Sequence, residues 1–276
     1  MHGFVRRSSV DNLQRIRHLL GDITLHYGDI TDFACVYRVI RKSQPHEIYN
    51  EADQDHVGYS CDSPRYSIDV TVGGVSNILE SMRSLNVSEL KFFQPVSATM
   101  FDTRHSPQNE TTPLNPTSPY ACAKAHSFHL VRHYRESYGV FACTAIMYNH
   151  ESPRRGEGYL LQKIVRAVNA GRPLELYNVH MPVDIGYAKE YMEAAHDIMQ
   201  LDEPDDFVLA TEREYKISYL ATAAYAHASL PSSFTAVESS EPESNMIGDI
   251  SKAQKAFGFA PKVHGAALIK LLMEGE

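Results

Sequence analysis

The sequence predicts an α/β fold with a parallel, doubly wound sheet. Short apolar runs that are typical of strands alternate with helix-like segments through the first half of the chain. Hydroxyl and charged residues follow several of these runs, and open α/β sheets bind their ligands at the carboxyl ends of their strands. After residue 157 the pattern becomes helix-rich. We therefore expect two domains, residues 1–157 and a smaller α/β region over residues 158–276, with some exchange of segments between them.

Composition limits the possible functions. The chain has 276 residues, 43% hydrophobic and 22% charged, which is usual for a globular protein, and its net charge of −8 argues against nucleic acid as the main partner. The cysteines have neither C-x-x-C nor metal-ligand spacing, so we expect reduced thiols and no metal site. No apolar run approaches the roughly 20 residues that a membrane helix needs, and no signal peptide is visible. We expect a cytoplasmic location. The cysteines are Cys35, Cys61, Cys122 and Cys143.

The first elements follow from short local patterns. Residues 2–5 are an apolar run that predicts a strand, and a helix-like segment and a second strand follow. Asp32 stands where it would cap the next helix. A third short strand then leads into an acidic loop. These expected elements cover residues 2–5, 11–20, 23–32, 33–43 and 47–50.

The loop after the third strand carries three carboxylates, Glu51, Asp53 and Asp55. In this class of fold such a strand-to-helix loop approaches the phosphates of a nucleotide cofactor. Carboxylates close to a pyrophosphate repel it unless they point away. A helix from Tyr66 to about residue 85 and a strand over residues 89–96 follow, and the strand places Ser97 at its carboxyl end.

The stretch from Ser97 to Lys124 has the residues for hydride transfer on an alcohol or ketone. A Pro-, Thr- and Asn-rich loop precedes a predicted helix over residues 120–138. Tyr120 and Lys124 are four residues apart, so they share one helix face. A lysine ammonium beside a phenol favours proton exchange near neutral pH, and Ser97 could hold the substrate oxygen. The Tyr-x-x-x-Lys spacing alone is common, so its neighbours decide its meaning.

Two arginine pairs follow predicted strands. Arg6 and Arg7 come directly after residues 2–5, where an arginine suits the 2′-phosphate of NADP. Arg154 and Arg155 follow a buried-type strand over residues 141–149, and guanidinium groups match diphosphate oxygens. Each pair could equally be a solvated surface pair, and composition alone does not decide between these interpretations.

The second half of the chain is predicted to contain mainly helices. A strand is expected near its middle, and a Ser/Glu/Pro-rich stretch is typical of a loop or a partly disordered link. The end of the chain predicts a short amphipathic helix closed by a Gly-x-x-Pro sequence. In order, these segments cover residues 160–171, 186–200, 207–210, 229–244 and 249–263.

Several runs together resemble the GDP-mannose 4,6-dehydratases of the extended short-chain dehydrogenase/reductase superfamily. They keep their order over nearly the whole chain, and the run NHESPRRGE directly after a buried strand is the most specific of them. The runs are VRRSS, LHYGDITD, HEIYN, SPYACAK, YRESYG with FAC, NHESPRRGE, EPDDFVLAT and GDISKAQKAFGF.

The resemblance implies an NADP-binding Rossmann domain and a smaller C-terminal domain for a nucleotide sugar. In the family, hydride leaves C4 of GDP-mannose for NADP, water is lost across C5–C6, and the hydride returns to C6. The product is GDP-4-keto-6-deoxy-mannose, a precursor of fucose-type sugars. The resemblance also implies a homo-oligomer, whereas a catalytically inactive homologue would form a hetero-oligomer with an active paralogue.

The family's site residues can be carried over to matching positions. Tyr120 would be the base at the C4 hydroxyl, Lys124 would hold the nicotinamide ribose, and Ser97 stands where the family has Thr. Asn149 would lie by the phosphates of the sugar nucleotide. The expected cofactor-binding residues are Arg6, Arg7, Ser8, Ser9, Asp29, Ile30, Glu51, Ala52, Asp53, Gln54, Asp55, Tyr66, Lys124, His150 and Arg155.

The sequence also departs from the family pattern. Thr99 stands where the family has the Glu that acts as acid/base in the C5–C6 elimination, and a hydroxyl has no suitable pKa for that step. The family's LAAQS loop is EADQD over residues 51–55, and its Arg-Asp-Trp-Gly run is Val183 to Gly186 here, without the Arg. The C-terminal region is shorter than the family's. Each of these changes argues against full activity.

A further departure lies at the start of the chain. The family opens with a strand and a Gly-x-x-Gly-x-x-Gly turn that cradles the pyrophosphate, whereas this sequence begins at what would be the second strand. The absent strand would be central in the sheet order 3-2-1-4-5-6, so two strand pairings would be lost.

Three hypotheses remain open from the sequence. The chain is a GDP-mannose 4,6-dehydratase-like, NADP-dependent lyase of reduced activity; or a catalytically inactive homologue that acts as an interaction or regulatory subunit; or a truncated gene model of an active dehydratase.

Overall fold

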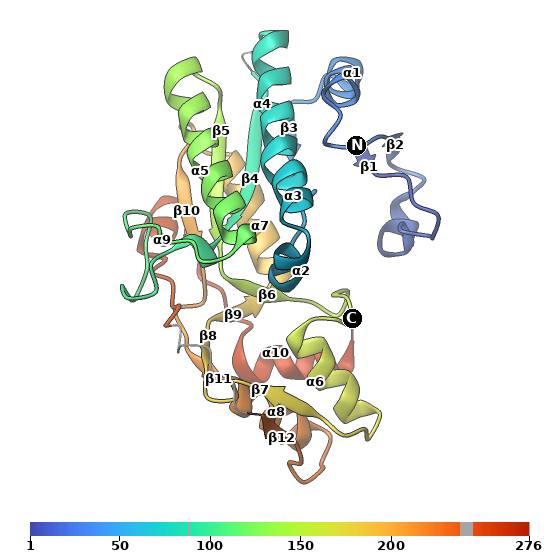
Figure 1. Ribbon diagram of the computed structural model, residues 1–276, viewed down its shortest axis with the longest axis vertical. Helices are drawn as coiled ribbons and strands as arrows, with labels where there is room; N and C mark the ends of the chain where they lie inside the picture. The colour runs from blue at the N-terminus through green and yellow to red at the C-terminus, as the bar shows by residue number, and fades with distance from the viewer. Residues whose placement is uncertain (88, 238–244, 276) are drawn as a thin grey trace. The chain divides into compact units, whose positions relative to one another are not determined.

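The computed structural model describes residues 1–87, 89–237 and 245–275, and the chain divides into two compact units. The first contains Met1–Met100, Pro116–Ala145 and Met199–Asp206, and the second contains Phe101–Asn115, Ile146–Ile198 and Phe207–Glu276. Helices and strands alternate along the chain (Figure 1). The predicted α/β class is confirmed.

The main sheet has four strands in the order β10-β5-β4-β3. β3 (Glu47–Tyr49) pairs in parallel with β4 (Lys91–Ser97), so that Ile48 lies opposite Phe92. Every residue of β5 (Ala142–Met147) and of β10 (Asp206–Leu209) is buried. Burial on both faces explains why these strands are continuous apolar runs in the sequence.

A second, separate pair of strands begins the chain. β1 (His2–Val5) and β2 (Thr24–Tyr27) are parallel, with Gly3 opposite Leu25. Among the described residues neither strand joins the main sheet, so the sheet is interrupted between β1 and β3. The interruption lies where the sequence predicted that a central strand is missing.

The helices of the first unit match the sequence prediction closely. Asp32 caps α1 (Phe33–Ser43) as expected, because its side chain accepts a 3.1 Å hydrogen bond from the Cys35 amide. The helix expected from Tyr66 to about residue 85 is one continuous helical segment that contains a π-helical turn. Its parts are α3 (Pro64–Ser67), the turn Ile68–Gly73 and α4 (Gly74–Leu85), and α2 (Val57–Asp62) precedes it.

One predicted element of the first unit differs in type. The helix expected over residues 11–20 is a 3₁₀ helix, Gln14–Leu19, and none of its residues is buried. It therefore lacks the packed face that stabilises an α-helix in a protein. The hydrophobic core lies instead between α1, α4, β4 and α5 (Pro119–Tyr138) and includes Val75, Leu79, Phe92 and Val131.

Among its described residues, the second unit contains helices and three short strand pairs. β6 (Asn149–Glu151) is parallel to β9 (Ile185–Tyr187), β7 (Glu175–Tyr177) is parallel to β12 (Thr235–Val237), and β8 (Pro182–Val183) is antiparallel to β11 (Tyr215–Lys216). The helices are α6 (Leu160–Asn169), α7 (Ala188–Met199), α8 (Ile217–His227), α9 (Ser251–Phe257) and α10 (Gly265–Glu274).

Two points in this unit bear on the sequence prediction. β12 lies inside the segment that was expected to be a loop. The strand forms by pairing with β7, which is far away in the sequence, so the local sequence did not indicate it. Residues 238–244 of that segment lie outside the described residues. Asp184, at the position after the lost Arg, is 1% exposed. In the described part of the chain, no helix has the length and apolar character to cross a membrane.

Candidate active site

Ser97 is the last residue of β4, at the carboxyl end where the sequence placed it. The 3₁₀ turn Ala98–Met100 follows at once and brings Thr99 back toward Ser97. The Thr99 hydroxyl donates to the Ser97 hydroxyl at 3.0 Å, and the Thr99 amide donates to the same oxygen at 3.3 Å. Both side chains are half-buried. Thr99 therefore lies beside the hydroxyl that was expected to hold the substrate oxygen.

Tyr120 and Lys124 lie in the first turns of α5. Ser118 caps this helix by accepting a 3.1 Å hydrogen bond from the Ala121 amide, and Pro119 occupies the first helical position, where no amide hydrogen is needed. The Tyr120 amide donates to the Ser60 hydroxyl at 3.1 Å, which anchors the helix start to α2. The Lys124 ammonium lies 5.7 Å from the centre of the Tyr120 ring. The predicted shared face is therefore present.

Lys124 is only 4% exposed and is held from two sides. Its ammonium donates to the Pro95 carbonyl on β4 at 3.1 Å, and it forms an ion pair with Asp53. Burial opposes the charged ammonium, but the Coulombic attraction of Tyr120 and Asp53 outweighs it, so the pKa of Lys124 is raised. The ammonium expected to hold a ribose is thus paired with a carboxylate from the acidic loop.

The acidic loop is held in place by its own polar side chains. Asp53 also accepts a hydrogen bond from Thr71. Gln54 is buried, where its amide donates to the His56 carbonyl at 3.0 Å and its oxygen accepts from Ser67 at 3.0 Å. The Ala52 amide donates to the side-chain oxygen of Asn50 at 3.3 Å. The Gln54 side chain therefore joins the loop to α3, and the Asp55 side chain is exposed.

Glu51 adds negative charge beside this loop. Solvent reaches the side chain through a pocket that it lines. The surrounding protein nevertheless removes much of its bulk hydration, and this effect, together with the Asp53 carboxylate, raises the pKa of Glu51 even though Lys124 opposes the shift.

The residues expected at the adenosine end of a cofactor lie near the ends of β1 and β2. The Arg6 guanidinium donates to the Tyr66 hydroxyl at 2.7 Å, so these two predicted residues are brought together. Hydrogen bonds from the Thr31 amide and hydroxyl to Asp29 lower the pKa of that carboxyl. Ile30 is 7% exposed and packs in the core. The remaining members, Arg7, Ser8 and Ser9, are exposed.

The second unit holds the residues of the Arg-Arg loop. The His150 ring stacks on Tyr191, with the ring centres 5.0 Å apart, and its Nδ1 lies 2.8 Å from the Tyr148 carbonyl oxygen. The Arg155 guanidinium covers the Tyr159 ring at 3.5 Å. Asn149 is exposed. A flat guanidinium on an aromatic ring keeps its edges oriented for planar anions.

Glu151 is a buried acid that the sequence prediction did not single out. Its residue is 6% exposed, and its Oε2 has no hydrogen-bond partner among the described residues. Burial raises the pKa of Glu151 to about 7, although Arg155 opposes the shift. Its place inside the NHESPRRGE run was a signal, but burial cannot be recognised from that run. Tyr191, 0% exposed beneath His150, was missed for the same reason.

Asp184 has a structural role. Its carboxylate accepts hydrogen bonds from the Thr211 amide at 2.8 Å, the Thr211 hydroxyl at 2.7 Å, the Glu212 amide at 3.1 Å and the Gly248 amide at 3.3 Å. Burial raises the pKa of Asp184 in spite of these bonds. The carboxylate therefore ties three segments of the second unit together.

The described residues fit one end of a nicotinamide dinucleotide. Arg6 and Arg7 are exposed cations at the carboxyl end of β1 and suit a 2′-phosphate. The loop beside Lys124 offers carboxylates instead of the amide donors that bind a pyrophosphate. Over residues 1–87, 89–237 and 245–275, no group of His, Cys, Asp or Glu side chains is arranged to hold a metal ion.

Comparison with known sequences gives consistent matches. The sequence model of one family, described as GDP-mannose 4,6 dehydratase, matches residues 1–272. "GDP-mannose 4,6 dehydratase 1" of Arabidopsis thaliana is 36% identical over 299 residues, which cover 99% of this chain and 82% of the relative. The "GDP-mannose 4,6-dehydratase" of Vibrio cholerae is 41% identical over 231 residues, covering 79% of this chain and 62% of the relative.

Solved structures share the fold at low sequence identity. A dTDP-glucose 4,6-dehydratase from Bacillus anthracis in complex with NAD has a TM-score of 0.86 at 16% identity, covering 99% of this chain and 87% of that one. RMD from Pseudomonas aeruginosa complexed with NADPH has a TM-score of 0.84 at 16% identity, covering 95% and 93%. At this identity the likeness establishes the Rossmann-like fold alone.

Proposed function

The chain belongs to the GDP-mannose 4,6-dehydratase family, and we propose that it keeps the hydride-transfer half of the family's reaction on a GDP-hexose while the loss of water is impaired. The observation that carries this proposal is Thr99, a neutral hydroxyl hydrogen-bonded to Ser97 at the position of the family's acid/base carboxylate. Tyr120 and Lys124 are retained, Ser97 keeps a hydroxyl where the family has Thr, and all three lie in the first unit together with Thr99.

The retained residues have distinct tasks. The Ser97 hydroxyl holds the C4 oxygen of the hexose, and the Tyr120 phenol takes the proton from that hydroxyl. Lys124 places a positive charge 5.7 Å from the centre of the phenol ring, where it attracts the negative charge that develops as the proton is transferred. When bound, a nicotinamide cofactor would supply the hydride acceptor for this oxidation. The buried position of Tyr120 and Lys124 restricts the access of water to the proton transfer.

The elimination needs a base that removes the proton from C5. The Thr99 hydroxyl does not accept a proton near neutral pH, and the loss of a general base typically slows a step by about 10²–10⁴-fold. In addition, the Thr99 hydroxyl already donates its proton in the hydrogen bond to Ser97. The oxidised sugar therefore accumulates instead of losing water.

We further propose NADP as the cofactor, because Arg6 and Arg7 supply cations for a 2′-phosphate. In the second unit, Asn149 binds the diphosphate of the nucleotide sugar and Arg155 binds the diphosphate of the cofactor. The Arg155 guanidinium, stacked on Tyr159, is oriented for that contact. We also propose a cytoplasmic location, in keeping with the family to which the chain belongs.

A single incubation tests the proposal. The purified protein is mixed with NADP and GDP-mannose, and two quantities are followed together: the absorbance of reduced cofactor and the product mass. We expect about one equivalent of reduced cofactor per site, with little product that has lost water. Loss of water at the rate of a family dehydratase assayed in parallel would contradict the proposal.

A second candidate function is that of a non-catalytic subunit that associates with an active relative. The ion pair between Asp53 and the buried Lys124 supports it, because it occupies the ammonium that would hold the nicotinamide ribose. This candidate predicts no reduced cofactor in the incubation above. It also predicts that the protein co-elutes with an active family dehydratase and changes its rate.

A further inference from the structure

The Ser97 hydroxyl has both of its acceptor positions occupied by Thr99. A serine hydroxyl has one proton to donate and two lone pairs that accept. The Thr99 hydroxyl donates to one lone pair at 3.0 Å, and the Thr99 amide donates to the other at 3.3 Å. Toward any further partner, Ser97 can therefore act only as a donor.

The proton of the Ser97 hydroxyl remains available for a ligand. Over residues 1–87, 89–237 and 245–275, this hydroxyl has no acceptor among the protein's own groups. Ser97 is half-buried and ends β4, at the carboxyl edge of the sheet where folds of this class bind their ligands. A ligand oxygen that enters here receives a hydrogen bond from Ser97.

Tyr120 provides a second hydroxyl at the same edge. α5 packs against β4 and against the turn Ala98–Met100, and the Lys124 ammonium joins α5 to β4 through its 3.1 Å hydrogen bond to the Pro95 carbonyl. Tyr120 is 9% exposed, and in the described part of the chain its hydroxyl has no hydrogen-bond partner. A phenol hydroxyl both donates and accepts.

A ketone oxygen and a sugar hydroxyl satisfy these two groups differently. A ketone oxygen has two lone pairs and no proton, so it accepts from Ser97 and Tyr120 together. A sugar hydroxyl brings a proton that Ser97 cannot accept. If Tyr120 accepts that proton, its own proton loses its acceptor, so one donor is left unpaired. The Thr99 oxygen could accept it only in a closed ring of three hydroxyls, whose bent hydrogen bonds are weak.

A carboxylate at position 99 would have the opposite effect. A carboxylate only accepts, so a Glu at this position would take the Ser97 proton instead of filling a lone pair of Ser97. Ser97 would then accept from the ligand, which suits a hydroxyl. Thr99 therefore does more than remove the base for the loss of water, because it also reverses the direction in which Ser97 hydrogen-bonds to the ligand.

We propose that the site prefers a GDP-linked 4-ketohexose to the corresponding 4-hydroxy sugar, and that Thr99 sets this preference through Ser97. The inference rests on the proposed function, in which Ser97 and Tyr120 contact the C4 oxygen of a GDP-hexose. Thr99 acts through Ser97 and is a positioning residue. The preferred ligand is the product of a reaction that oxidises a GDP-hexose at C4, so the protein retains this ketone after it forms.

The test measures equilibrium binding by calorimetry on the purified full chain, without cofactor. It compares GDP-4-keto-6-deoxy-mannose with GDP-6-deoxy-mannose, which differ only in the oxygen at C4. The difference of one hydrogen bond and one unpaired donor corresponds to about tenfold in affinity. We therefore expect the ketone to bind about tenfold more tightly. Neither ligand can exchange a hydride without cofactor, so the ratio reports binding alone.

Two variants at position 99 separate the hydroxyl of the side chain from its size. Thr99→Val keeps the shape but frees a lone pair of Ser97, so the preference should fall to within about threefold. Thr99→Ser keeps the donor and should retain the preference of about tenfold. Because each value is a ratio of two ligands on the same protein, a general loss of affinity or stability cancels.

The proposal is overturned if the unaltered protein binds the two ligands within about threefold of each other, or if Thr99→Val retains the full preference. The first criterion still applies if Thr99→Val does not fold. Equal binding of both ligands leaves the proposed oxidation of a GDP-hexose intact. Failure of both ligands to bind removes the GDP-hexose site and overturns both proposals.

Discussion

Replacing Glu151 by Gln should change how the stability of the protein depends on pH. Glu151 is 6% exposed and its pKa is raised from 4.5 to about 7 by burial. One pKa unit corresponds to about 1.4 kcal/mol, so the shift is equivalent to about 3 kcal/mol. Because the folded pKa lies above the unfolded one, the contribution of the neutral acid is complete below pH 4.5 and is lost as the pH rises through about 7.

The assay is urea unfolding at pH 5 and at pH 8 for the unaltered protein and for Glu151→Gln. The amide has the shape of the protonated acid, so the two proteins should have similar free energies of unfolding at pH 5. At pH 8 the variant should be more stable by about 2–3 kcal/mol. The pKa of Asp184 is also raised, so only the difference between the two proteins isolates Glu151.

A matched control uses another glutamate of the second unit. The Glu157 side chain is 75% exposed and pairs with Arg166 on the surface, so Glu157→Gln should change stability by less than about 1 kcal/mol at either pH. If the difference between the unaltered protein and Glu151→Gln is the same at pH 5 and pH 8, the burial argument for Glu151 is refuted.

Three further changes test the first unit. Asp53→Ala leaves Lys124 buried without its ion-pair partner and should lower the free energy of unfolding by about 3–5 kcal/mol. Because Asp53 no longer occupies the Lys124 ammonium, the variant should also bind the cofactor more tightly in a titration. Unchanged stability would contradict the ion pair. Arg6→Ala should weaken NADP binding by about 10–100-fold and leave NAD binding unchanged, and an equal loss for both cofactors would argue against a 2′-phosphate contact. Tyr120→Phe should slow cofactor reduction by about 10²–10⁴-fold at unchanged substrate affinity; a rate within threefold of the unaltered protein's would remove Tyr120 from the proton transfer.

The sequence was most informative where structure depends on neighbouring residues. Helical periodicity placed Tyr120 and Lys124 on one face, and a strand pattern placed Ser97 at the end of β4. The cap at Asp32 was also correct. Each of these depends on residues within about one turn or one strand, so no knowledge of the tertiary fold was needed.

Long-range pairings explain what the sequence did not show. The partner of Lys124 is Asp53, far away in the chain, and nothing in either local run indicates their ion pair. Burial of Glu151 likewise depends on the packing of the whole second unit. The strand β12 formed because a distant partner, β7, was available, and no local pattern predicts that pairing.

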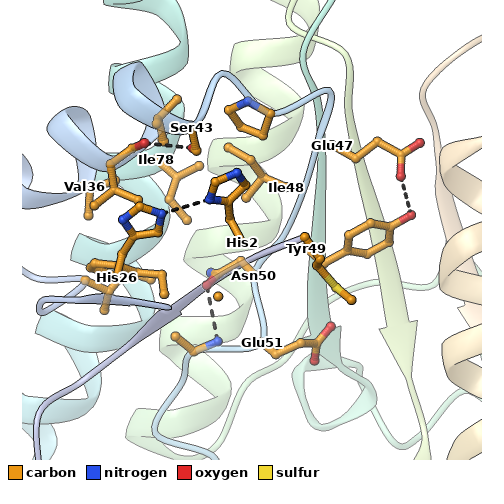
Figure 2. Close-up of a pocket in the computed structure, with 18 of the residues that line it drawn as sticks. His2, His26, Val36, Ser43, Glu47, Ile48, Tyr49, Asn50, Glu51 and Ile78 are labelled. Carbon is orange, nitrogen blue, oxygen red and sulfur yellow. Dashed lines mark hydrogen bonds between the residues drawn. The ribbon is translucent and has the colours of Figure 1, made fainter. Parts of the chain in front are cut away.

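The interruption of the sheet was predicted in part from the sequence and in part became visible only in the structure. The order of strands in doubly wound folds predicted that β1 and β3 would lack a common neighbour. The pocket that residues of both strands line (Figure 2) could be recognised only in the structure.

The central claim is that the residue at position 99 limits the loss of water, and a pair of variants tests it most directly. Thr99→Glu supplies a carboxylate, and Thr99→Gln has the same size without acid/base capacity. With NADP and GDP-mannose, we expect Thr99→Glu to form dehydrated product at least about 10²-fold faster than the unaltered protein, and Thr99→Gln to show no gain. Equal rates for the two variants, or rapid dehydration by the unaltered protein, would contradict the claim.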